Sequence, residues 1–315
     1  MENIAVIGIG ALGKRHLQSL MNLKDDYSIY AVEVNKEVIQ RLKDEMPEAH
    51  FCTSIAELPE FISAAVIATN SNIRRLVFEQ LISHCNISNI LFEKVLFQRE
   101  EDYYSVQEKI RDYGINAWVN CARREWDSYK DLKIELEICK KMYFYADGGQ
   151  WGIGCNGIHM LDLIEFLSDS KIKELNIDKL EKGVFESKRK GFYEFFGTIS
   201  GGSVKCKDFR ISCIQDSSLP FNIEIDTNSA RYIIDEGHNS LFTASEKNGW
   251  KWMKREFLPL YQSQMTERVI KNILDKGTCN LPDYESSMEL HLKFIKPLVR
   301  FFNMNGMEGN VCPIT

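Results

Sequence analysis

The sequence lacks several features that would assign its class directly. No stretch approaches the roughly 18 consecutive apolar residues of a membrane-spanning helix, so we expect no membrane association. The nine cysteines form no C-x-x-C pair and no histidine-rich spacing, which argues against any metal site and against a zinc-dependent alcohol dehydrogenase. An odd, scattered set of cysteines predicts reduced thiols and a cytoplasmic protein. The net charge of −6 argues against nucleic acid as a partner.

The remaining composition is that of an ordinary globular protein. Its 315 residues, 44% hydrophobic and 27% charged, have the length expected of two domains. The first ten residues, MENIAVIGIG, have neither a basic segment nor a cleavage-like site. We therefore interpret them as the first β-strand of the fold rather than as a signal peptide.

A glycine-rich motif follows this strand. The apolar run 3–7 is typical of a parallel strand buried on both faces, and residues 8–13, GIGALG, match the pattern G-x-G-x-x-G. A helical pattern and a second strand come next, and that strand ends near Glu33, about 20 residues after the motif. Strand, glycines, helix, strand and acid in this order predict dinucleotide binding, whereas the glycine pattern alone would be a weak signal.

Each part of the motif has a physical role in that prediction. Gly8 permits the tight turn, Gly10 lets the backbone approach the pyrophosphate, and Gly13 allows close packing of helix and strand. The start of the helix offers unpaired N–H groups and the positive end of its dipole. Glu33 would accept hydrogen bonds from the adenosine ribose and would repel a 2′-phosphate, which favours NAD over NADP. The predicted cofactor contacts here are Gly8, Gly10, Ala11, Leu12, Gly13 and Glu33.

Strands and helices continue to alternate up to residue 119. We predict helices over 38–46, 72–84 and 103–113, and strands over 64–69, 87–92 and 115–119. This alternation predicts an α/β fold with a doubly wound parallel (Rossmann) sheet, whose ligands bind beyond the carboxyl ends of the strands. Candidate site residues at those ends include five further predicted cofactor contacts, Thr69, Asn70, Asn72, Glu93 and Lys94.

The glycine pattern occurs a second time as GIGCNG, 152–157, but without the same context. The preceding apolar run 141–146 is separated from it by five residues, and no acidic strand end follows at the right distance. We expect a glycine-rich loop that enters a helix and lets a substrate or cofactor approach the backbone. His159 and Asp162 share one face of that helix. The alternative is a core histidine whose ring nitrogens are satisfied.

Taken together, these segments resemble the glucose–fructose oxidoreductase / inositol dehydrogenase / MocA (Gfo/Idh/MocA) family of nicotinamide-dependent sugar oxidoreductases, and most of all its members from surface-polysaccharide and nucleotide-sugar pathways. The resemblance rests on GIGALGKRH at 8–16, ATNSN at 68–72, FEKVL at 92–96, VNCARR at 119–124, GCNGIHMLDL at 154–163 and the helix 281–295. It implies a second α/β domain with a large, mostly antiparallel sheet, often used for oligomers, so a homodimer or homotetramer is expected.

The second half of the chain is consistent with such a sheet. We predict strands over 192–198, 203–214, 220–226 and 230–234, with breaks at 176–178, 201–202 and 235–237. The domain boundary is placed near Val119, which gives a Rossmann domain over 1–118 and a substrate-binding and oligomerisation domain over 119–315. The resemblance implies that the C-terminal helix returns toward the first domain.

Two family motifs carry functional residues. The glutamate–lysine–proline motif falls on Glu93-Lys94-Val95, and the aspartate–x–glycine–x–histidine motif falls on Cys155 to His159. The resemblance implies that Lys94 orients the substrate hydroxyl and takes part in proton transfer. Val95 replaces the proline, which argues against a cis peptide bond, since such bonds cost about 3 kcal/mol away from proline. Cys155 replaces the aspartate and is expected mainly to pack.

The implied chemistry is hydride transfer between NAD and a secondary alcohol or ketone of a sugar or nucleotide sugar. Oxidation of an alcohol needs a base with a pKa near the working pH, and an unperturbed histidine starts near ~6.5. We expect His159 to be the principal acid/base and Lys94 its hydroxyl-orienting partner, although either residue could take the proton. The predicted substrate contacts are Lys94, Asn120, Arg123, Arg124, Trp151, Cys155, Asn156 and His159.

Several alternatives stay open. The replaced aspartate and proline favour a catalytically silent NAD- and sugar-binding sensor or scaffold. An imine or tetrapyrrole-type reductase of the same fold is a further alternative, against which Lys94 and His159 argue mildly. Arg123 and Arg124 either form a solvated basic turn or bind a substrate phosphate or carboxylate. Arg74, where the family usually has histidine, could likewise meet an anion.

Overall fold

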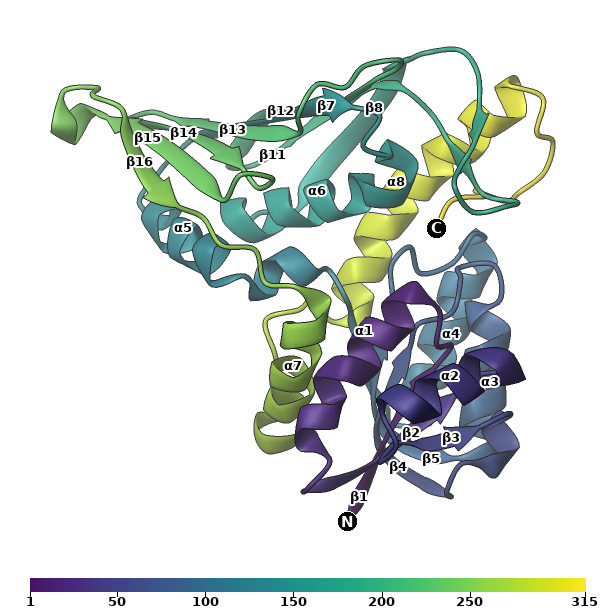
Figure 1. Ribbon diagram of the computed structural model, residues 1–315. Coiled ribbons are helices and arrows are strands. Elements are labelled where there is room, and N and C mark those ends of the chain that lie inside the picture. The colour runs from purple at the N-terminus through teal and green to yellow at the C-terminus, as the bar shows by residue number, and fades with distance from the viewer. The chain divides into compact units, whose positions relative to one another are not determined.

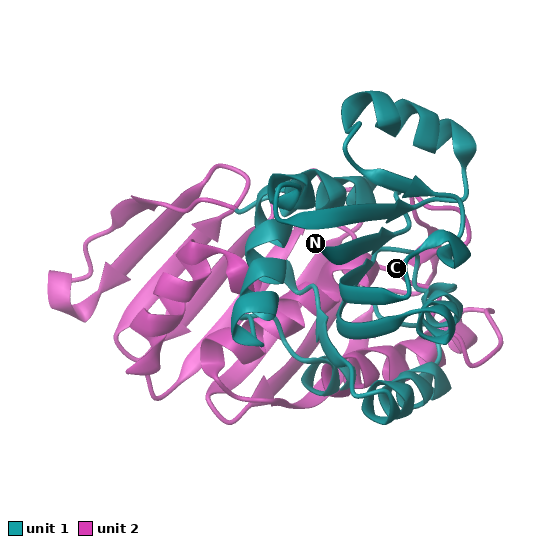
Figure 2. Cartoon of the chain, turned by 90° about the horizontal axis from the view of Figure 1, so that it is seen from below, with its two compact units in different colours: residues 1–122, 260–288 teal, residues 123–259, 289–315 magenta.

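The computed structural model describes all 315 residues. They form two compact units, coloured separately in Figure 2. Unit 1 consists of residues 1–122 and 260–288, and unit 2 of residues 123–259 and 289–315. The sequence predicts one break near Val119, whereas packing in the structure also joins residues 260–288 to unit 1.

Unit 1 is built on a parallel sheet of six strands in the order β3-β2-β1-β4-β5-β6. This is the strand order of dinucleotide-binding Rossmann sheets. The central strands are buried on both faces, as their continuous apolar sequence predicts. The strands are β1 (Glu2–Ile7), β2 (Tyr27–Val32), β3 (His50–Cys52), β4 (Phe61–Ile67), β5 (Asn86–Phe92) and β6 (Asn116–Val119).

One helix of unit 1 comes from far along the chain. Helix α7 lies beside α1 (Figure 1), and its apolar side chains Val269 and Ile273 join the core cluster that contains Leu17 and Leu20. The sequence analysis did not assign α7 to this unit. The helices are α1 (Ala11–Leu20), α2 (Lys36–Glu45), α3 (Arg74–His84), α4 (Glu100–Asp112) and α7 (Gln262–Lys276), and α8 (Tyr284–Met304) contributes its first residues.

Unit 2 contains a mostly antiparallel sheet of eight strands in the order β16-β15-β14-β13-β7-β12-β11-β8. Only the pair β7 and β12 is parallel. The two sheets confirm the predicted fold class. The strands are β7 (Met142–Gly149), β8 (Ile172–Leu180), β11 (Gly197–Ser203), β12 (Cys206–Ile214), β13 (Asn222–Thr227), β14 (Ala230–Asp235), β15 (Ser240–Ser245) and β16 (Met253–Glu256), and a small hairpin pairs β9 (Phe185–Glu186) with β10 (Tyr193–Glu194).

Helices α5 (Asp127–Glu137) and α6 (Ile153–Ser168) lie along one face of this sheet (Figure 1). Alternate residues of the central strand β7 point toward that face, so Met142 and Phe144 are fully buried, while Tyr143 and Tyr145 are only partly buried. The side chains of α6 are buried on most sides. The sheet and α5 therefore fix the position of α6, which carries His159.

Three strand predictions for unit 2 are wrong. The predicted strand 192–198 is divided between β10 and β11, and the predicted breaks at 176–178 and 201–202 lie inside β8 and β11. Gly201 stays in the strand because β8 packs so closely that a Cβ would lie 2.2 Å from the carbonyl oxygen of Glu174. Strand β8 is at the sheet edge and pairs only with β11, so its lysine, glutamate, asparagine and aspartate side chains can face water. These polar residues are why the sequence pattern predicts a break. No helix of the structure combines the length and the apolar character needed to cross a membrane.

Candidate functional site

The first glycine motif forms the turn between β1 and α1, and the structure is compatible with the role predicted for each glycine. Gly8 has φ +89°, in the region that favours glycine. A Cβ atom on Gly13 would lie 1.9 Å from the carbonyl oxygen of Gly8, so helix and strand pack too closely for any side chain. A Cβ on Gly10 would meet no protein atom within 4 Å. The loop therefore leaves open space where a cofactor would approach the backbone.

The start of α1 is suited to bind an anion. Its N-cap residue Gly10 has no side-chain cap, and its first turn contains no acidic residue. No side chain of the helix itself therefore neutralises its first N–H groups and the positive end of its dipole. A pyrophosphate group fits this position, as it does at other helix N-termini of this kind.

Glu33 lies immediately after β2 and is held beside the glycine loop. Its Oε2 atom accepts a hydrogen bond of 2.9 Å from the N–H of Ile9, and its Oε1 atom accepts one of 2.9 Å from the N–H of Asn35. The carboxylate is thereby fixed next to the turn, at the position where the sequence analysis expects a ribose contact. The glycine loop and Glu33 together fit a dinucleotide.

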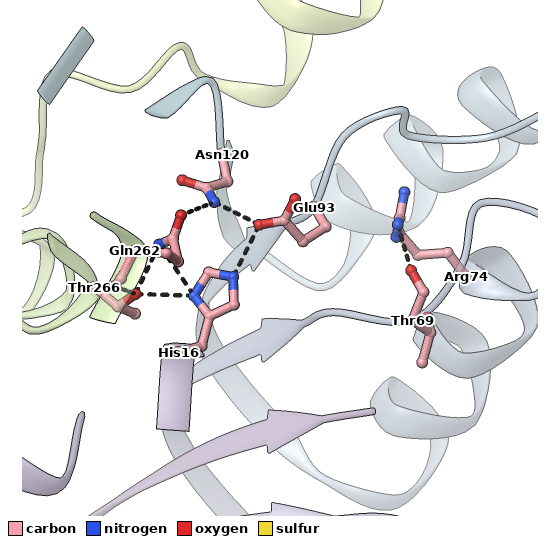
Figure 3. A network of polar contacts seen from close by, with 7 residues as sticks. All are labelled: His16, Thr69, Arg74, Glu93, Asn120, Gln262 and Thr266. Atoms are coloured by element: carbon pink, nitrogen blue, oxygen red, sulfur yellow. Dashed lines mark hydrogen bonds and ion pairs between the residues drawn. The ribbon is translucent and has the colours of Figure 1, made fainter. Parts of the chain in front are cut away.

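A buried polar network lies at the carboxyl ends of β5 and β6 (Figure 3). Nε2 of His16 is 2.8 Å from Oε1 of Glu93, and Nδ1 of His16 is 2.9 Å from the hydroxyl of Thr266. Asn120 donates to Glu93 and, over 2.8 Å, to Gln262, whose amide also donates to Thr266 over 2.8 Å. We call these five residues the His16–Glu93 network. It joins α1, two strand ends and α7 within unit 1.

The charge of Glu93 is stabilised inside this network. Complete burial by itself raises the pKa of a carboxyl, but the hydrogen bond and charge of His16, the amide of Asn120 and the charge of Lys94 outweigh it. The pKa of Glu93 is therefore below its ordinary value, and the side chain is a carboxylate at neutral pH. Removing one member of this buried, hydrogen-bonded network is costly, because the remaining polar groups lose their partners away from water.

The peptide bond after Lys94 and the side chain of Arg74 both differ from expectation. The peptide bond between Lys94 and Val95 is cis, although Val95 replaces the family's proline. Arg74, which could have met an anion, is buried, and it donates hydrogen bonds to the carbonyl oxygens of Val95, Thr69 and, over 2.8 Å, Leu96. Its role is to tie the loop after β4 to the loop after β5; Figure 3 shows the contact with Thr69.

Only one end of the Asn120 amide, a predicted substrate contact, is used within the protein. Its amide nitrogen is used by the His16–Glu93 network, while its amide oxygen is buried and makes no hydrogen bond in the protein. The hydroxyl of Thr69, a predicted cofactor contact at the end of β4, is also buried without a hydrogen bond. Buried polar atoms normally have partners, so these two atoms at the ligand-binding edge of the sheet fit contact with a bound group.

The second glycine motif binds an anion that the protein supplies itself. At the start of α6, the carboxylate of Glu194 accepts hydrogen bonds from the N–H groups of Gly154, at 2.6 Å, and Cys155, at 3.1 Å. A Cβ on Gly154 would lie 2.8 Å from this carboxylate, and one on Gly157 would lie 3.1 Å from the ring of Phe294. The two glycine motifs thus use the same helix-terminus physics, but only α1 is left open to an external phosphate.

The predicted substrate residues of α6 lie on and around its first turns. Cys155 and His159 are four residues apart, so their side chains share one helical face. The amide of Asn156 donates a 2.9 Å hydrogen bond to the carbonyl oxygen of Trp151. Cys155, Asn156 and Trp151 line one cavity of unit 2. His159 is partly buried, on the same helix as this group.

Arg123 and Arg124 are paired with carboxylates and do not form a solvated basic turn. Arg124 forms two hydrogen bonds of 2.8 Å with the buried carboxylate of Asp162. Arg123 forms bonds of 2.8 and 2.7 Å with Glu236. Burial lowers the pKa of Arg123, but the carboxylate of Glu236 outweighs it, and the net pKa is raised. Both arginines thus hold elements of unit 2 together, and substrate contact by either stays a prediction.

Sequence reasoning missed four residues of these sites. His16 lies in the motif GIGALGKRH and is buried in the structure. Its helical spacing from Leu17 and Leu20, on the buried face of α1, is the signal that could have found it. Gln262 and Thr266 had no local signal, because they are 246 and 250 residues from His16. Glu194 is 40 residues from Gly154, so no local pattern could indicate that it caps α6.

Comparison with known proteins agrees with this geometry. Residues 2–121 match the family described as the GFO_IDH_MocA oxidoreductase family with an NAD-binding Rossmann fold. The match covers the parallel sheet and the glycine loop of unit 1, which are the parts that would bind the dinucleotide. No curated protein matches the sequence.

Several solved structures share the fold of this protein along nearly the whole chain. UDP-N-acetylglucosamine 3-dehydrogenase GnnA from Acidithiobacillus ferrooxidans has a TM-score of 0.71 at 13% identity, and 92% of this chain and 94% of that one are covered. A super-repressor mutant of Gal80p from Saccharomyces cerevisiae has a TM-score of 0.73 at 13% identity, over 99% and 98%. The transcriptional regulator Gal80p from Kluyveromyces lactis has a TM-score of 0.72 at 14% identity, over 96% and 89%. At these identities the likeness shows the fold alone.

The two predicted catalytic residues belong to different units. Lys94 follows β5 in unit 1, and His159 lies on α6 in unit 2. Their meeting at one nicotinamide ring stays a prediction.

Proposed function

We propose that the protein transfers a hydride between a nicotinamide cofactor and a secondary alcohol or ketone of a sugar or nucleotide sugar. The observation that carries the proposal is the contrast between the two glycine motifs. Helix α1 begins at an open, uncapped glycine turn with Glu33 fixed beside it, as a dinucleotide requires. The family match over residues 2–121 supports the same cofactor class.

The cofactor is proposed to be NAD rather than NADP. Glu33 would accept hydrogen bonds from the ribose hydroxyls and would repel a 2′-phosphate at the same place. Its carboxylate is held by two backbone N–H groups, which fixes it against displacement by a phosphate. Gly8, Gly10 and Gly13 would hold the pyrophosphate, and Thr69 would contact the bound group at the end of β4.

Two side chains are proposed to carry out proton transfer. Bound NAD supplies the hydride acceptor. In the oxidative direction, the imidazole of His159 accepts the proton of the substrate hydroxyl, while the ammonium group of Lys94 orients that hydroxyl and stabilises its developing negative charge. In the reductive direction the same two groups polarise the carbonyl and return the proton. The substrate is proposed to be a small sugar or nucleotide sugar, and the protein a homo-oligomer.

The test is turnover at the reduced-nicotinamide absorbance band with a panel of sugars and nucleotide sugars. His159→Ala and Lys94→Ala should each lower kcat by about 100-fold or more, as expected for loss of a general acid/base or its charged partner. His159→Ala should also remove the pH dependence of kcat near the histidine range. His238→Ala and Lys43→Ala are matched controls, because they remove the same residue types at exposed positions outside the proposed site. Full turnover of both variants would refute the assignment.

A sensor without catalytic activity is the second candidate. The likeness in fold to the regulator Gal80p and the replacement of the family's aspartate by Cys155 favour it. Such a sensor would bind NAD with normal affinity and would also bind a sugar, but no sugar would change the nicotinamide absorbance. An imine or tetrapyrrole-type reductase would instead oxidise the reduced cofactor with an imine and ignore sugars.

A further inference from the structure

Unit 2 contains a cavity of about 500 Å³ between the β9–β10 hairpin and the start of α6. Its volume lies in the range of ~300–1,000 Å³ that is usual for small-molecule sites. The strand β10 contributes Glu194, the helix contributes Cys155 and Asn156, and the loop before the helix contributes Gln150 and Trp151. All of these elements belong to unit 2.

Aromatic side chains make up much of the cavity wall. They come from the hairpin and from the loop before α6, and are Trp151, Phe185, Phe192, Tyr193 and Phe196. The indole N–H of Trp151 donates a 2.8 Å hydrogen bond to the carbonyl oxygen of Ser212, and its ring packs against Phe221 at 4.9 Å. Phe185 and Phe196 form an edge-to-face pair at 5.1 Å. These contacts hold rigid aromatic surfaces in place before any ligand arrives.

The polar groups of the wall are suited to hydroxyl groups rather than to an anion. Amides come from Gln150, Asn156 and Gln215, carboxylates from Glu186, Glu194 and Asp216, and cations from Lys188 and Arg189. Three carboxylates against two cations leave a formal charge of −1. One of the cations, Arg189, donates to the hydroxyl of Thr315 over 3.2 Å. Carboxylates and amide oxygens accept hydrogen bonds from hydroxyl groups, whereas the net charge disfavours phosphate.

The start of α6, a helix N-terminus of the kind that often binds phosphate, is already filled. The carboxylate of Glu194 occupies the start of α6 and accepts from the N–H groups of Gly154 and Cys155. A second anion there would displace this carboxylate or be repelled by it. Gly152 and Gly154 leave the space that Glu194 fills, since a Cβ on either would approach its carboxylate to 3.2 or 2.8 Å.

We infer that this cavity binds an uncharged, polyhydroxylated glycosyl unit, and that Glu194 makes it reject phosphate. The inference rests on the proposed function, because it concerns the substrate of the same protein. Aromatic surfaces contact the C–H faces of the sugar ring, while the amides and carboxylates accept from its hydroxyl groups. Glu194 is a specificity-determining residue in this account and takes no part in proton transfer.

The experiment measures binding to the full chain, with saturating NADH, by isothermal titration and ligand-observed NMR. The probes are the methyl glycosides of glucose, galactose and N-acetylglucosamine and the matching 1-phosphates. At least one methyl glycoside should bind, and the matching 1-phosphate should bind no more tightly. Trp151→Ala should weaken the glycoside at least tenfold. Glu194→Gln should tighten the 1-phosphate at least tenfold and change the glycoside less than threefold.

Two exposed residues outside the cavity provide the controls. Trp252→Ala and Glu246→Gln change exposed residues outside the cavity wall and should leave both affinities unchanged. If Glu194→Gln does not fold, glycoside binding by the wild type should still be independent of salt between about 0.05 and 0.5 M. Tighter binding of the 1-phosphate by the wild type, lost on Lys188→Ala, would overturn the inference. So would the failure of every probe to bind.

Turnover separates this inference from the proposed function. Glycoside binding that depends on Trp151, without any change in nicotinamide absorbance, would support the cavity and refute the oxidoreductase activity. Turnover of sugars with a KM that neither Trp151→Ala nor Glu194→Gln changes would support the activity and refute the cavity assignment.

Discussion

Two alanine substitutions in the first glycine motif should separate cofactor binding from folding. In Gly10→Ala the new Cβ would meet no protein atom within 4 Å, and the backbone of Gly10, with φ −69° and ψ −167°, is allowed for alanine. In Gly13→Ala the new Cβ would lie 1.9 Å from the carbonyl oxygen of Gly8. The first substitution changes only the space open to a ligand, and the second changes the contact between α1 and β1.

The magnitudes follow from these contacts. Gly10→Ala gains up to about 1 kcal/mol from the stiffer unfolded chain and loses a few tenths as a poorer helix cap, so stability should hardly change. Gly13→Ala gains about 1 kcal/mol of helix propensity, but its clash is with backbone and cannot be relieved by a side-chain rotation. Overpacking costs about 1–3 kcal/mol, and a contact of 1.9 Å with backbone belongs to the upper part of that range, so the gain of about 1 kcal/mol leaves a net loss of about 1–2 kcal/mol.

Thermal denaturation and NADH titration are the assays. A loss of about 1–2 kcal/mol should lower the Tm of Gly13→Ala by about 2–8 °C for a unit of this size. Gly10→Ala should keep its Tm within about 2 °C and bind NADH at least tenfold more weakly, a change of about 1.4 kcal/mol. Gly10→Ala that binds NADH within twofold of the wild type would refute the assignment of the glycine turn.

Three further predictions concern carboxylates. Glu93→Gln keeps the shape of the side chain but removes the negative charge that His16 and Asn120 stabilise, and should cost about 1–3 kcal/mol at pH 7 in chemical denaturation. Because the pKa of Glu93 lies below its ordinary 4.5 in the folded state, its contribution is complete above that pH and is lost as the pH falls through the folded pKa, so the gap to the variant should shrink on acidification. Glu33→Ala should lower the preference for NAD over NADP at least tenfold in paired affinity measurements, with Glu37→Ala as the control; an unchanged ratio would exclude Glu33 as the selector. Gly154→Ala should displace Glu194 and lower the free energy of unfolding by about 1–2 kcal/mol, which thermal denaturation would show as a lower Tm. Gly237→Ala, whose new Cβ would make only ordinary contacts, should leave the Tm unchanged.

The sequence by itself was sufficient for the parts of the molecule that rest on local patterns. The buried strand, the glycines and the helix over 2–20 are neighbours in the chain, so their spacing predicts both their shape and their ligand class. The alternation up to residue 119 predicts the parallel sheet for the same reason. The prediction that the second glycine motif is not a nucleotide site also came from local context, namely the five residues that separate it from the apolar run 141–146.

The tertiary structure decided every feature that depends on a partner far along the chain. Nothing near Gly154 indicates that Glu194 caps its helix, and nothing near His16 indicates Thr266. Arg123 and Arg124 look like an anion site in sequence, because a local pattern shows their charge but not the carboxylates of Glu236 and Asp162 that neutralise it. Periodicity reports which face of an element is buried, while the identity of its neighbour is set only when the chain folds.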